Sequence, residues 1–80
     1  MLNFLIYNRF NFTKYQLDEI KEGYKNHIDI SIYAKPEFDW RQMEQIRIGL
    51  EKGIDVSVYV KPEFSWKQMH EILINQKPLN

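Results

Sequence analysis

The chain contains no cysteine, so it offers no disulfide framework, thiolate metal site or cysteine nucleophile. This absence suits a reducing compartment, and we expect the protein to be cytoplasmic. Net charge is also lacking, because 11 basic residues balance 11 acidic ones. The balance makes nucleic acid unlikely as a partner and argues against a membrane, since nucleic acid and anionic lipid both attract a basic excess. No apolar run approaches the roughly 18 residues that a membrane-spanning helix needs.

The composition is nevertheless that of a folded protein. With 44% hydrophobic and 15% aromatic residues in 80, the chain can bury one small core, and we expect a single domain over residues 1–80. The apolar opening, residues 1–7, lacks the basic lead and the small-residue cleavage site of a signal peptide. We interpret it as the start of the first structural element.

The chain repeats itself. Three 26-residue copies occupy residues 2–27, 28–53 and 54–79. The second and third copies are identical at 13 of 26 positions, and the first and second at six. Terminal repeats diverge because one side has no neighbour, and about three units are the usual minimum for a stable stack. The repeats therefore predict a miniature solenoid with one shared core.

The first part of each copy has the pattern of a strand. Residues 28–34 and 54–60 alternate apolar and polar side chains, which is typical of a strand with one buried face. Residues 2–8 align with them and are expected to form the first strand.

The second part of each copy has the pattern of a helix. Thr13, Asp39 and Ser65 are predicted N-caps, because each is followed three residues later by a glutamine. Trp40 and Trp66 come directly after two of these caps, and we expect both to fill the core.

Strand and helix in one repeating frame require parallel strands joined by right-handed crossovers. The predicted fold is therefore α/β: a three-repeat β-α solenoid with a parallel three-stranded sheet, order 1-2-3, and three helices on one face. Ile30, Ile32, Val56 and Val58 should lie beneath the helices. The opposite strand face is mainly polar and should be exposed.

That exposed face is the predicted binding surface of a non-enzymatic protein–protein interaction module. Tyrosine supplies large, rigid contact area with few rotors to freeze, and the repeats would arrange like residues in rows across the strands. The candidate binding residues are Tyr7, Tyr33, Tyr59, Arg9, Lys35, Lys61, Asp29 and Asp55. Two alternatives remain: a solvated face whose tyrosines pack on one another, and a small-ligand or single-stranded nucleic-acid binder that uses the tyrosines and lysines as a stacking surface.

Catalytic and metal-binding patterns are weak. Asp29 and Asp55 could form a carboxylate pair for acid–base chemistry or for a hard cation. No third oxygen-rich residue converges on them, so hydrogen bonding at strand starts is favoured. His27 and His70 occupy unrelated repeat positions and read as surface residues. We therefore expect no enzymatic activity, no metal and no cofactor.

The C-terminal copy is predicted to carry an association surface. Positions 22, 48 and 74 read Glu, Ile and Ile, so the helix flank becomes more apolar towards the end of the chain. The third strand would also be an edge without charge or proline to discourage pairing. We predict a homodimer with two-fold symmetry, the commonest oligomeric solution. The candidate interface residues are Leu73, Ile74, Val56, Val58 and Val60.

Residues 38–64 have the sequence FDWRQMEQIRIGL, EKGIDVSVYV and KPEF in succession. This pattern resembles a strand–helix repeat of small, mostly uncharacterised bacterial and mobile-element proteins, with a good match over 28–74 and a weak one over 2–27. The repeat carries no established activity. Some short proteins of such origin, including anti-CRISPR proteins, inhibit host defence, so the resemblance implies such an inhibitor as one form of the interaction module.

Overall fold

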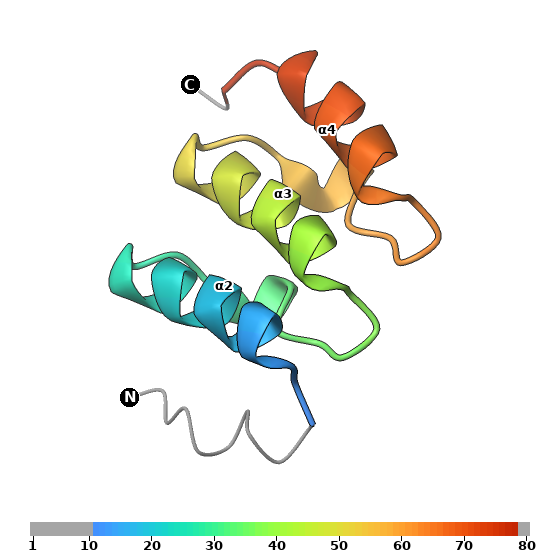
Figure 1. Ribbon diagram of the computed structural model, residues 1–80. Helices are drawn as coiled ribbons and strands as arrows, with labels where there is room; N and C mark the ends of the chain where they lie inside the picture. The colour runs from blue at the N-terminus through green and yellow to red at the C-terminus, as the bar shows by residue number, and fades with distance from the viewer. Residues whose placement is uncertain (1–10, 79–80) are drawn as a thin grey trace.

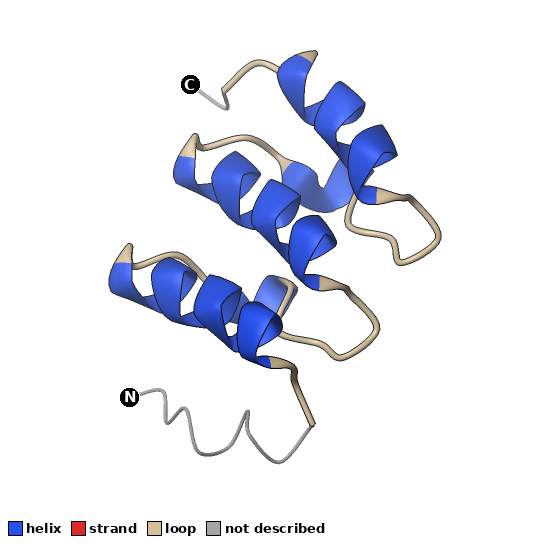
Figure 2. Cartoon of the chain, viewed as in Figure 1, coloured by secondary structure: helices blue, strands red, loops and turns tan. Residues whose placement is uncertain are grey.

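The computed structural model describes residues 11–78, which form a row of helices backed by short turns (Figures 1 and 2). The elements are α2 (Lys14–Lys25), the 3₁₀ turn η1 (Ile30–Ile32), α3 (Trp40–Glu51), the 3₁₀ turn η2 (Val56–Val58) and α4 (Trp66–Ile74). The helices lie side by side in one layer, and the two turns lie behind them. None of these helices is long and apolar enough to cross a membrane.

Each helix begins at a capping box, which confirms the predicted helix starts. The Thr13 side chain accepts a hydrogen bond from the Gln16 N–H at 3.1 Å, and the Gln16 Oε1 accepts one from the Thr13 N–H at 2.7 Å. The same reciprocal pair occurs at Asp39 and at Ser65, each with the glutamine three residues later. Because the pair satisfies two backbone donors at the helix start, it sets the first residue of the helix locally.

The predicted α/β fold is wrong: within residues 11–78 the structure contains helices and turns and no strand. The segments 28–34 and 54–60, expected as strands, contain the 3₁₀ turns η1 and η2. The parallel three-stranded sheet in order 1-2-3 is therefore wrong as well, and the repeat stack is helical. The first expected strand, residues 2–8, lies outside the described residues.

Local hydrogen bonds explain why these segments turn. The Asp55 carboxylate accepts hydrogen bonds from the Ser57 N–H at 3.1 Å and from the Ser57 hydroxyl at 2.6 Å. The N–H groups of Tyr59 and Val60 both donate to the Val56 carbonyl, at 2.9 and 3.0 Å. The backbone is thus satisfied within the turn, which competes with pairing in a sheet.

The turn also changes which side chains are buried. A 3₁₀ turn has three residues per turn, so residues i and i+3 share a side, whereas a strand alternates. Val56 and Tyr59 are therefore buried together, at 5% and 0% exposure, and Val58 is 45% exposed. The equivalent residues in η1 are the buried Ile30 and Tyr33 and the half-buried Ile32. The prediction of burial was right for Ile30 and Val56 and wrong for Val58.

Glutamine side chains join each unit to the next. Gln16 donates from Nε2 to the Phe38 carbonyl at 2.6 Å, and Gln42 donates from Nε2 to the Phe64 carbonyl at 2.6 Å and to the Pro62 carbonyl at 3.0 Å. Both glutamines are buried. One residue type therefore caps its own helix and holds the loop that leads into the next helix.

An ion-pair network adds to the contact between α2 and α3. Arg47 of α3 reaches Glu19 of α2 at 2.8 Å and Glu51 of its own helix at 2.8 Å. Burial alone would lower the pKa of Arg47, but hydrogen bonds to Glu19 and Glu51 outweigh it and raise that pKa. Burial, together with the nearby charges of Glu44 and Glu22, raises the pKa of Glu19 despite the opposing effect of Arg47. The network bridges the two helices, and its charged groups pair with one another.

Candidate interaction groove

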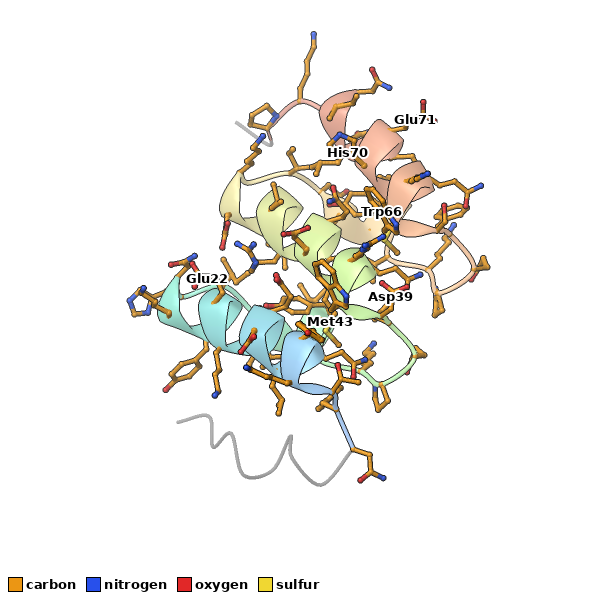
Figure 3. The ribbon with its side chains drawn as sticks, viewed as in Figure 1. Glu22, Asp39, Met43, Trp66, His70 and Glu71 are labelled. Atoms are coloured by element: carbon orange, nitrogen blue, oxygen red, sulfur yellow. The ribbon has the colours of Figure 1, made fainter. Side chains whose placement is uncertain are left out.

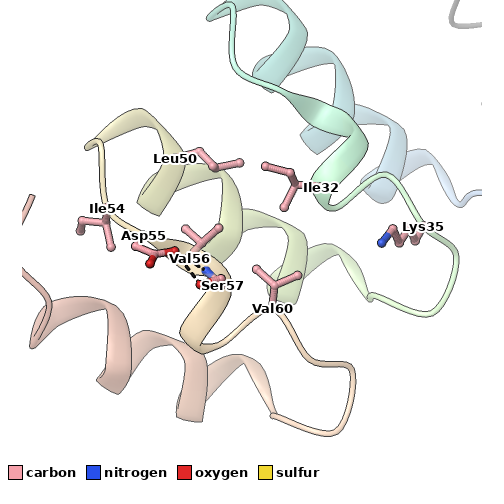
Figure 4. A pocket seen from close by; sticks show the side chains of 8 residues that line it. All are labelled: Ile32, Lys35, Leu50, Ile54, Asp55, Val56, Ser57 and Val60. Atoms are coloured by element: carbon pink, nitrogen blue, oxygen red, sulfur yellow. Dashed lines mark hydrogen bonds between the residues drawn. The ribbon is translucent and has the colours of Figure 1, made fainter. Parts of the chain in front are cut away.

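An open apolar groove of about 510 Å³ lies on the turn side of the molecule, between the second repeat copy, residues 28–53, and the third, residues 54–79 (Figure 4). Ile32 of η1 and Leu50 of α3 form one part of its lining, and Ile54, Val56 and Val60 form another. Ile54 and Val56 are buried, whereas the other three are half-buried and reach the surface. The groove therefore has an apolar floor that solvent can reach.

Charged groups line the rim of this groove. Lys35 and Asp55 are both exposed, and Ser57 lies beside Asp55. The Asp55 carboxylate is ionised at neutral pH, and hydrogen bonds from the Ser57 side chain and backbone lower its pKa further below the ordinary value of 3.8. The rim thus holds a fixed anion and a cation on either side of apolar lining. Four residues selected from the sequence line this groove: Lys35, Asp55, Val56 and Val60.

The expected row of exposed tyrosines does not exist among the described residues. Tyr33 and Tyr59 are 0% exposed, and their hydroxyls donate to the carbonyls of Glu19 at 2.6 Å and Gln45 at 2.8 Å. Burial raises the pKa of both tyrosines, which keeps the hydroxyls protonated as donors. These rings are core residues that fasten each turn to its helix. Tyr7 and Arg9 lie outside the described residues.

The aspartates and lysines do not form rows across a sheet. Asp29 and Asp55 each cap their own turn, bonded to the serine two residues later. Lys61 is exposed, with its ammonium 5.6 Å from the centre of the Phe64 ring. Within residues 11–78, no group of three or more His, Cys, Asp or Glu side chains could hold a metal ion. The structure therefore brings Lys35 and Asp55 to one groove and leaves Asp29 and Lys61 outside it.

The predicted interface residues separate into buried and exposed ones. Leu73 is 4% exposed and its side chain lies against α3, where a Cβ on Gly49 would touch it. Ile74, by contrast, is 62% exposed on α4. With no third strand in the described residues, the strand-pairing form of the predicted dimer is wrong. Of the other candidates, Val58 is exposed, Val60 is half-buried and Val56 is buried.

A row of aromatic and cationic side chains crosses the first turns of the helices. The sequence did not predict it, because both tryptophans were assigned to the core. The Arg41 guanidinium lies 5.2 Å from the Trp40 ring centre and 5.4 Å from the Trp66 ring centre. Tyr15 lies 6.1 Å from Trp40, and Lys67 lies 5.8 Å from Trp66. Both tryptophans are half-buried. Aligning positions 15, 41 and 67 beside the tryptophans could have indicated this cation–π packing.

Comparison with known proteins yields no relative. A scan of family models and searches of curated proteins and solved structures gave no match to the chain. The resemblance to mobile-element repeats therefore stays a prediction, and the function must be inferred from the groove and the surface.

Proposed function

We propose that the protein is a non-enzymatic protein-interaction module that binds a partner segment in the groove between η1 and η2. The observation that carries the proposal is the open apolar lining of Ile32, Leu50 and Val60 between the ionised Asp55 and Lys35. The proposed binding surface is therefore this groove and not a tyrosine face.

The size of the groove suits a side chain or a short segment. Sites that hold small ligands and peptide side chains are mostly apolar hollows of about 300–1,000 Å³ with a few placed polar groups. At about 510 Å³ the groove falls within this range. We infer that an apolar anchor residue of the partner enters it, with an acidic neighbour near Lys35.

The burial of Tyr33 and Tyr59 argues against the alternative of a single-stranded nucleic-acid or small-ligand binder. That alternative required Tyr33 and Tyr59 at the surface, and both are 0% exposed. The balanced charge of 11 basic and 11 acidic residues also offers no electrostatic attraction to a polyanion.

The repeat supplies matched variants for a test. Val58 and Lys61 occupy the same repeat positions as Ile32 and Lys35 but do not line the groove. Peptides selected on the protein from a random phage-displayed library should bind at least about tenfold more weakly to Ile32→Ala and to Lys35→Glu. Val58→Ala and Lys61→Glu should keep the affinity of the unmodified protein. Fluorescence anisotropy of a labelled selected peptide would measure each affinity.

Three results would overturn the proposal. One is that the selection yields no binder, and another is that its binders respond equally to groove variants and to their matched controls. The third is tight binding of a single-stranded oligonucleotide with steep salt dependence, which would favour the alternative.

A further inference from the structure

Helix α4 ends the row of described helices, so no described helix lies against its outward face (Figure 1). Gln16 and Gln42 are buried and donate to the next loop, whereas the equivalent Gln68 is exposed and makes no such bond within residues 11–78. Ile46 is 0% exposed, but its equivalent Ile72 is only half-buried. The face that joins units inside the stack is therefore open at α4.

The first repeat of a second protein molecule, which contains α2, would not fit this open face of α4. At the position that tryptophan holds in α3 and α4, helix α2 has Lys14, which would meet Lys67 as Trp66 meets Arg41. By the same alignment, Asp18 would face Glu71. Only one charged pair, Lys21 with Glu71, would be attractive, as Arg47 is with Glu19. Like charges at two of three positions oppose head-to-tail growth.

We propose that α4 pairs with α4 of a second copy of the chain in an antiparallel contact about a two-fold axis. Lys67 and Glu71 are one helical turn apart, and Glu71 lies on the outer side of α4 (Figure 3). In an antiparallel pair, Lys67 faces the partner's Glu71, and symmetry repeats the ion pair.

Apolar side chains flank this charged seam. Ile72 is half-buried on one side, and Ile74 is 62% exposed on the other. A two-fold symmetric contact would shield both isoleucines from water. It would also place each Lys67 opposite a Glu71 of the partner. The surface is separate from the groove, so the pairing stands or fails independently of the proposed function.

Light scattering coupled to size-exclusion chromatography tests the contact. The unmodified protein should have about twice the 9.8 kDa chain mass at high concentration. Ile74→Asp should give a single-chain mass with an unchanged circular dichroism spectrum. Val58→Asp changes an apolar residue of comparable exposure, 45% against 62%, and should leave the dimer intact.

Charge reversal distinguishes this pairing from a general apolar association. Lys67→Glu and Glu71→Lys should each be monomeric, because each creates two like-charge pairs across the axis. Mixing the two monomeric variants should restore a dimer of one copy of each, since every cross-axis pair is then complementary. A double variant carrying both changes should also dimerise.

A monomeric mass for the unmodified protein at millimolar concentration would overturn the proposal. Species larger than a dimer that grow with concentration would also overturn it, in favour of head-to-tail assembly. Failure of the mixed variants to associate would show that Lys67 and Glu71 do not meet across the contact.

Discussion

The hydroxyl of Tyr59 rests on Gly49 of the preceding helix so closely that a Cβ at residue 49 would overlap it. The same hydroxyl donates a hydrogen bond to the Gln45 carbonyl at 2.8 Å. Tyr33 lies on Gly23 in the same way one repeat earlier. Each of these helices therefore has a slot, left by a missing side chain, that receives the tyrosine of the turn that follows it.

Filling this slot should destabilise the protein. Although alanine is the better helix former by about 1 kcal/mol, Gly49→Ala should lower the free energy of unfolding by about 1–3 kcal/mol because the core is overpacked. Urea denaturation followed by circular dichroism would measure the loss. In a Tyr59→Phe background the same change should cost less but not nothing, since Val56 Cγ1 also lies 2.7 Å from the added Cβ. Strictly additive effects of the two substitutions would contradict this packing.

His27 occupies a backbone conformation that suits glycine. Its φ is 62°, and Gly53 at the equivalent position has φ 72°. Because a side chain in this left-handed region costs roughly 1–2 kcal/mol, His27→Gly should raise the free energy of unfolding by about 1 kcal/mol, even after the added entropy of the unfolded chain. The reciprocal Gly53→His should lower it, and no atom lies within 4 Å of a Cβ there to add a packing effect. Thermal melts that move in the same direction for both variants would refute the assignment to backbone strain.

The glutamines that link units should matter only where a next unit is present. Gln42→Ala should cost about 2 kcal/mol, because it removes two part-buried hydrogen bonds, to the Phe64 and Pro62 carbonyls. Gln68→Ala removes only an exposed cap contact and should cost less than about 1 kcal/mol. Chemical denaturation of the two variants side by side gives the comparison. Equal losses would mean that the loop contacts of Gln42 contribute nothing beyond its cap.

The buried tyrosines predict a loss of stability at alkaline pH. Burial raises the pKa of Tyr33 and Tyr59 above the ordinary value of 10.0, so the folded state holds protons that the unfolded chain releases. Their contribution is fully present below pH 10 and declines as pH rises above it. Urea midpoints measured between pH 8 and pH 11 should fall, and the fall should be smaller when both tyrosines are replaced by phenylalanine. An identical decline in that double variant would assign the effect to other groups.

The helices could be predicted from the sequence because their start signals are local. The Thr13, Asp39 and Ser65 caps bond to the backbone three residues away, so short-range chemistry decides where α2, α3 and α4 begin. The turns could not be predicted in the same way. Alternation at 54–60 indicates one buried side but does not separate a strand from a turn in which Val56 and Tyr59 share that side.

The candidate groove was only partly accessible to sequence reasoning. Lys35, Asp55 and Val60 were selected as members of a sheet, and they meet instead because η1, which packs on α2, and η2, which packs on α3, border the same groove. Leu50 joins them from α3, and Ile32, which was expected beneath the helices, is half-buried in the lining. Which residues line one groove depends on how the repeats pack against each other. That packing joins residues 20 or more positions apart in the sequence.

The sequence by itself determined the 26-residue period and the helix starts, because repeated residues can be aligned without a structure and capping boxes join groups only three residues apart. Only the tertiary structure decided that Tyr33 and Tyr59 are core residues. A tyrosine at the end of an alternating segment suits a solvent-exposed face. It equally suits a buried slot in which a carbonyl accepts a hydrogen bond from its hydroxyl. That slot exists only when Gly23 or Gly49 of the preceding helix packs against the turn, ten residues before the tyrosine that fills it.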